Sequence, residues 1–136
     1  MYQSNHLSHA DAMKIIGAIQ ARLEEEKKGA AIAIADAQGE LLAFLRTDGC
    51  KLPSIMIAIN KAFTAAREQK ESFEVGESSR RQGYPMTNFG DLRYTAWGGG
   101  VPIVHQGQVV GAVGVSGLPE SEDMELARMG AKVIEE

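Results

Sequence analysis

The feature that most constrains the fold is the stretch WGGGVPIVHQGQVVGAVGVSG, residues 97–117, which places many glycines among apolar residues. Such a segment either surrounds the phosphates of a nucleotide or forms strands that another group approaches closely. A Walker loop needs a Gly-Lys pair, and the chain contains none. The dinucleotide fingerprint G-x-G-x-x-G fails as well, because Ile103 follows Gly98 and Gly100 where the third glycine belongs. The stretch therefore matches neither phosphate-binding motif.

The same stretch fits a glycine-rich β-hairpin. Apolar residues alternate up to His105, and the Gln106-Gly107 pair that follows suits a tight turn. One face of the expected return strand carries Val109, Gly111, Val113 and Val115. On the other face, Ala112 and Gly114 leave a shallow surface against which a helix, a neighbouring subunit or a flat ligand could lie.

The residues before this hairpin predict two helices and another hairpin. The S-x-x-D spacing of Ser8 and Asp11 indicates a helix N-terminus, and helical apolar spacing continues to about Lys28, with Gly29 as the expected cap. Residues 30–46 form two apolar runs around a turn at 36–39. A second helix is predicted from Pro53 or Ser54 to Lys70.

The remaining segments complete a single domain over residues 1–136. Residues 71–94 are the least periodic, and we expect a short helix and an extended loop there, a candidate lid or subunit contact. A closing helix is predicted from Pro119 or Glu120 through Val133. Hairpins link neighbouring strands, so we predict an α+β fold with a mainly antiparallel sheet covered by helices.

Composition restricts the partners of such a domain. The net charge is −4, which argues against general affinity for nucleic acid or an anionic membrane. The N-terminal residues show no basic leader before an apolar region, and no window of the sequence is apolar enough to span a bilayer. The single Cys50 agrees with a reducing compartment. We therefore expect a cytoplasmic protein whose partners are small molecules or other protein chains.

Histidines and one lysine are the candidates for chemistry. His6 and His9 lie three apart at a helix start, a spacing that can share a metal but is more often a pair of solvated residues. His105 lies beside a turn. Lys61 falls on a helix that is apolar on most sides, and a buried lysine is costly unless paired. Its expected partner is Asp48 or Asp36, or an anionic ligand, with the structural ion pair slightly favoured.

Three strings together resemble the GlcG/HbpS-like family: DAQGELLAFLRTDG at 36–49, SIMIAINKAFTA at 54–65 and GGVPIVHQGQVVGAVGVSG at 99–117, with Asp123 shortly after. These are small haem-binding or haem-degrading domains, also found at the C-terminus of PduO-type corrinoid adenosyltransferases. The resemblance implies a profilin-like fold with a central antiparallel sheet of about five strands flanked by helices. It also implies homo-oligomers, often octamers, with a ligand groove near the subunit contacts.

The resemblance implies haem as the cofactor, since haem iron accepts histidine among other axial ligands and the propionates need nearby cations. Candidate iron ligands are His9 and His105, with His6 less favoured. Candidate propionate partners are Arg46, Lys61 and the pair Arg80 and Arg81, and the predicted cofactor site is completed by Thr64, Gly99 and Gly100.

Three functions are compatible with this sequence. The leading hypothesis is a small-ligand-binding accessory protein that handles haem or a related tetrapyrrole in a catabolic operon. A second is an enzyme that degrades haem oxidatively or acts on a small carbonyl or hydroxy-acid substrate, with Lys61 and Asp48 as its acid-base pair. A third is a structural subunit of an oligomer without a bound cofactor.

Overall fold

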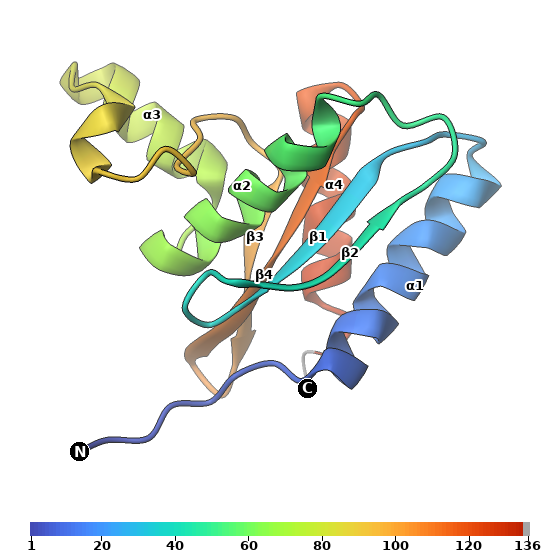
Figure 1. Ribbon diagram of the computed structural model, residues 1–136, viewed down its shortest axis with the longest axis horizontal. Coiled ribbons are helices and arrows are strands. Elements are labelled where there is room, and N and C mark those ends of the chain that lie inside the picture. Colours follow the sequence, from blue (N-terminus) through green and yellow to red (C-terminus); the bar gives the residue numbers. More distant parts are fainter. Residues whose placement is uncertain (135–136) are drawn as a thin grey trace.

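The computed structural model describes residues 1–134 as an antiparallel sheet with helices on both faces (Figure 1). The elements in chain order are α1 (His9–Glu25), β1 (Ala31–Asp36), β2 (Leu41–Arg46), α2 (Ser54–Glu68), α3 (Ser72–Gln82), the 3-10 helix η1 (Met86–Phe89), β3 (Gly100–His105), β4 (Gln108–Ser116) and α4 (Glu120–Ala131). The strand order is β2-β1-β4-β3, and all neighbours are antiparallel. The predicted α+β class is confirmed.

The described residues form four strands rather than the expected five or so. The stretch between α2 and β3 is the longest one free to supply another strand, and it forms α3, η1 and a loop instead. Among residues 1–134 no helix is both long enough and apolar enough to cross a lipid bilayer.

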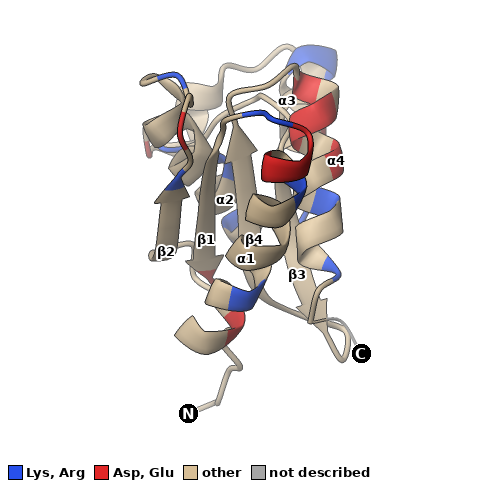
Figure 2. Cartoon of the chain, turned by 90° about the vertical axis from the view of Figure 1, so that its right-hand side faces the viewer, with Lys and Arg blue, Asp and Glu red and all other residues tan. Residues whose placement is uncertain are grey.

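Strand β1 separates two different cores. Its isoleucines, Ile32 and Ile34, pack with the isoleucines of α1 and the valines of β4. Its alanines face the other way and pack against the alanines of α2. Figure 2 shows the consequence: α1 and α4 cover the near face of the sheet, and α2 lies behind it. Because large and small residues alternate along β1, α1 packs on its isoleucine face and α2 packs on its alanine face.

The shallow face of the β3–β4 hairpin receives α2. A methyl group on Gly114 would overlap the carbonyl oxygen of Ala58, and one on Gly100 would overlap the carbonyl oxygen of Lys61. The glycines thus let the helix backbone approach the sheet closely. The predicted pattern of the return strand is wrong at one point: the register shifts after Ile103, so Val110 enters the core and Val109 is only half-buried.

Helix α1 begins as predicted and ends earlier. The Ser8 hydroxyl accepts a hydrogen bond from the Asp11 amide, 3.1 Å. The helix stops at Glu25 rather than near Lys28, because Lys27 adopts the left-handed conformation with φ 58°. The amide of Lys28 then donates back to the Leu23 carbonyl, 2.9 Å, which closes the helix end. Gly29, the expected cap, instead lies where a side chain would overlap residues 48–50.

The segment between α2 and β3 contains the expected helix and loop, and its end is fixed onto α2. The rings of Phe89 and Tyr94 stack 4.2 Å apart, and Tyr94 meets Phe63 edge to face. Burial and the Glu68 carboxylate, which accepts the Tyr94 hydroxyl at 3.0 Å, raise the pKa of Tyr94 to about 12. A few residues further on, Gly98 lies against the start of α4, where it meets Glu120 and Met124.

Candidate functional site

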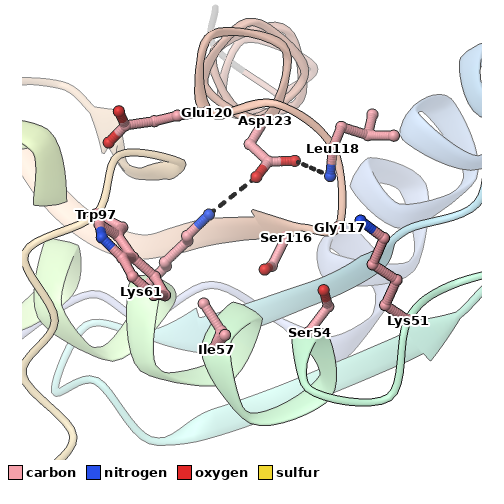
Figure 3. Close-up of a pocket in the computed structure, with 10 residues that line it drawn as sticks. All are labelled: Lys51, Ser54, Ile57, Lys61, Trp97, Ser116, Gly117, Leu118, Glu120 and Asp123. Atoms are coloured by element: carbon pink, nitrogen blue, oxygen red, sulfur yellow. Dashed lines mark hydrogen bonds and ion pairs between the residues drawn. The ribbon is translucent and has the colours of Figure 1, made fainter.

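A cavity of about 280 Å³ lies between the N-terminal ends of α2 and α4, where β4 ends (Figure 3). The residues that line it come from the loop before α2, from α2 itself, from the loop before β3 and from the β4–α4 connection. They are Lys51, Ser54, Ile57, Lys61, Trp97, Ser116, Gly117, Leu118, Glu120 and Asp123. Charged, hydroxyl and apolar groups therefore share one small space.

Lys61 and Asp123 form a buried ion pair on one wall of this cavity. Their residues are 2% and 3% exposed, and Lys61 Nζ lies 3.0 Å from Asp123 Oδ2. The same ammonium donates to the Val115 carbonyl, 2.9 Å, and Asp123 Oδ1 accepts the Leu118 amide, 3.1 Å. The predicted ion pair therefore exists, but the predicted partners, Asp48 and Asp36, are wrong. Because α4 packs against the end of β4, its first turn supplies the carboxylate.

Burial raises the pKa of the Asp123 carboxyl, and the ammonium of Lys61 and the neighbouring backbone amides oppose that rise. The pair joins α2 to α4 across the end of the sheet. The acid-base pair of Lys61 and Asp48 is not formed, since Asp48 lines a separate surface hollow beside Thr47 and Gly49.

The loop before β3 is held at the mouth of the cavity by Glu120. Its Oε2 accepts the Gly98 amide at 2.6 Å. Gly99 has φ 123°, and a Cβ there would lie 2.8 Å from Lys61 Nζ, so only glycine leaves room for the ammonium. Gly99 and Gly100 thus lie beside Lys61, as the predicted cofactor site had grouped them. Trp97 is exposed and lines the entrance.

Two hydroxyl groups in the cavity have no protein partner. Ser54 and Ser116 are each 5% exposed, and neither hydroxyl makes a hydrogen bond with a described residue. In Figure 3 both oxygens point into the space between Lys61 on one side and Lys51 on the other. No motif in the sequence points to these serines or to Lys51 as site residues.

The other predicted site residues lie elsewhere. Thr64 is buried, and its hydroxyl donates to the Asn60 carbonyl at 2.8 Å and accepts the Thr95 amide at 3.0 Å, so it anchors the loop before β3. Arg46 is exposed at the end of β2 and does not line the cavity. Arg80 and Arg81 are exposed on α3, where Arg80 pairs with Glu77.

A second hollow, of about 500 Å³, lies at the opposite end of β4, beside the β3–β4 turn. It is lined by Asn5, His6, Leu7, Asp11, His105, Gln106, Val110 and Ile134. The structure therefore brings His105 together with His6, whereas the other predicted ligand, His9, is exposed on α1 and is not among the residues that line the hollow. Within residues 1–134 no group of three or more His, Cys, Asp or Glu side chains is placed to hold a metal ion.

The family model described as haem degrading protein HbpS-like matches residues 7–132. The chain belongs to the HbpS-like family. Within this family, protein GlcG of Escherichia coli K12 is 38% identical over 117 residues, covering 81% of this chain and 81% of GlcG.

Solved structures agree with the HbpS-like assignment. A double mutant of the Streptomyces reticuli protein HbpS superimposes with a TM-score of 0.90 at 29% identity, covering 100% of this chain and 92% of that one. A PduOC:Heme complex superimposes with a TM-score of 0.85 at 23% identity, covering 95% of each chain. The second likeness shows the shared fold.

Proposed function

We propose that this HbpS-like protein is a haem-binding accessory protein and that it holds the haem iron in the hollow shared by His6 and His105. The observation that carries the proposal is that two imidazoles and three apolar side chains are among the residues that line one hollow. The family description and the haem bound to PduOC support it.

The residues of this hollow fit a haem. Imidazole is a common axial ligand of haem iron, and the macrocycle needs an apolar surface, which Leu7, Val110 and Ile134 provide. His105 is half-buried at the end of β3, so the hairpin fixes its position. His6 is exposed, but its neighbour Leu7 is buried and donates its amide to the Val110 carbonyl, 2.9 Å, which ties the segment to β4. A bound haem would supply an iron centre capable of electron transfer or of binding a further ligand.

The cavity around Lys61 fits a haem less well. None of the described residues that line it is a His, Cys, Met or Tyr, the side chains that ligate haem iron. Its volume of about 280 Å³ is also just below the range of roughly 300–1,000 Å³ found for pockets of drug-sized ligands. The residues of the predicted cofactor site thus lie apart, with His105 at one end of the sheet, Lys61, Gly99 and Gly100 at the other, and His9 exposed on α1.

Titration of the purified protein with haemin tests the proposal. We expect a shifted and saturable Soret band at micromolar haemin. The double variant His6→Ala/His105→Ala should lose the spectrum of imidazole-bound haem, and His9→Ala, the matched control, should keep it. An unshifted haemin spectrum in the unsubstituted protein, or an identical spectrum in the double variant, would contradict the proposal.

We further propose that the protein assembles as a homo-oligomer, with an octamer as the state that the family resemblance implies. Exposed apolar side chains support this, because Leu52, in the turn before α2, and Met56, in the first turn of the helix, both present apolar surface to solvent.

A further inference from the structure

We infer that the cavity between α2 and α4 binds a small organic monocarboxylate. This site is distinct from the hollow of His6 and His105, because no residue lines both. The inference is therefore independent of the proposed haem function, and either can fail without the other.

The first support is the pair of unpartnered hydroxyls. A hydroxyl that makes no hydrogen bond within the protein and opens onto a cavity is available to donate to a ligand there. Ser54 and Ser116 are more than nine-tenths buried, they lack partners among the described residues, and their oxygens face the same space in Figure 3. They can together donate to one acceptor group placed between them.

The second support is the charge around that space. Helix α2 has no acidic residue in its first turn and no side-chain cap from Pro53. The amides of Ser54 and Ile55 already donate to the Lys51 and Leu52 carbonyls, so this helix end favours an anion through the field of its dipole. Lys51 lies just before this helix end and makes no ion pair with the described residues. An anionic group between the two serines would therefore meet a helix N-terminus and a free ammonium.

The two carboxylates of the lining do not occupy this position. Asp123 directs Oδ2 to Lys61 and Oδ1 to the Leu118 amide. Glu120 binds the Gly98 amide and, in Figure 3, its carboxylate lies away from both hydroxyls. Both acids therefore hold the cavity wall together, while hydrogen-bond donors remain free for a ligand.

Charge balance and shape select the class of anion. Two lysines and two acids line the cavity, so their formal charges cancel and a single negative charge suits the site better than a phosphate dianion. Ile57, Leu118 and the ring of Trp97 provide apolar walls. A monocarboxylate with a short aliphatic or aromatic body satisfies the donors and the walls within about 280 Å³.

Trp97 provides the readout, since it is the single tryptophan of the chain and lines the cavity. We would titrate the haem-free protein with benzoate and butyrate at constant ionic strength, following tryptophan fluorescence, and use benzamide and butyramide as matched neutral probes. A saturable change is expected for the carboxylates, with affinity at least about tenfold above that for the amides.

The variant Ser54→Ala/Ser116→Ala should weaken carboxylate binding by about tenfold, and Lys51→Gln should weaken it as well. The exposed residues Ser121 and Lys14 supply the controls, and Ser121→Ala and Lys14→Gln should bind as the unsubstituted protein does. Circular dichroism verifies folding of each variant. Equal binding of amides and carboxylates, unchanged affinity in the double serine variant, or no response up to roughly 10 mM carboxylate would overturn the inference.

Discussion

At the scale of single residues, the pair of Lys61 and Asp123 is the most informative. The sequence shows that Lys61 lies among apolar residues of a helix and must be neutralised, and this prediction is confirmed. The partner could not be predicted, because 62 positions separate the two residues and only the packing of α4 onto the sheet brings them together. Asp36 and Asp48 are nearer in sequence but point elsewhere.

Removing one member of this pair should be costly. Lys61→Met leaves the Asp123 carboxylate buried without its counter-ion, and we expect the free energy of unfolding to fall by about 3–5 kcal/mol. The double variant Lys61→Met/Asp123→Leu removes both charges and should recover most of that loss. Urea denaturation followed by circular dichroism measures both. The single variant Asp123→Leu is measured in the same way, and if the loss in the double variant equals the sum of the two single losses, the pair is not coupled as described.

At the scale of elements, the small residues of the β3–β4 hairpin were read correctly from the sequence, since α2 occupies the shallow face that they form. The bulge after Ile103 was missed, because an alternating pattern shows no extra residue until the partner strand is known. The end of α1 was also missed, because a lysine takes the left-handed position that usually favours glycine.

Two glycine substitutions test the close approach of α2. Gly114→Ala places a methyl group against the Ala58 carbonyl, and we expect a loss of about 1–3 kcal/mol in unfolding free energy. Gly17→Ala is the matched control, since Gly17 is exposed within α1 and nothing lies within 4 Å of an added Cβ. It should stabilise the protein by roughly 0.5–1 kcal/mol. Similar effects of both substitutions in thermal denaturation would show that Gly114 does not set the helix position.

At the scale of the whole molecule, the two cavities lie at opposite ends of β4. Val110 of that strand lines one cavity and Ser116 lines the other, a distance of roughly 20 Å along the strand. The sequence identified some residues of each, His105 for one and Lys61 with its glycines for the other, but grouped them as one site. The two groups lie apart because each is placed at a different end of β4 by the tertiary arrangement of the helices. A local sequence pattern does not contain that information.

Assembly is the second property of the whole molecule that can be tested. Met56 and Met13 are about equally exposed, at 58% and 57%. Met56 lies in the first turn of α2, four residues after the exposed Leu52, and Met13 lies on α1. We expect Met56→Glu to lower the molar mass measured by light scattering after size exclusion, because a buried carboxylate disrupts an apolar contact. Met13→Glu should leave the mass unchanged. A monomeric unsubstituted protein, or the reverse order of effects, would contradict the proposed interface.

The alanine layer between β1 and α2 has a mechanical consequence. A methyl side chain has no rotamers, so the spacing between this helix and the sheet cannot adjust by rearranging side chains. Contacts between the main chains of α2 and the sheet therefore set the spacing at this interface. Helix α2 forms one side of the cavity, so its fixed distance from the sheet also fixes the position of that cavity wall. A ligand must therefore fit the cavity without moving α2.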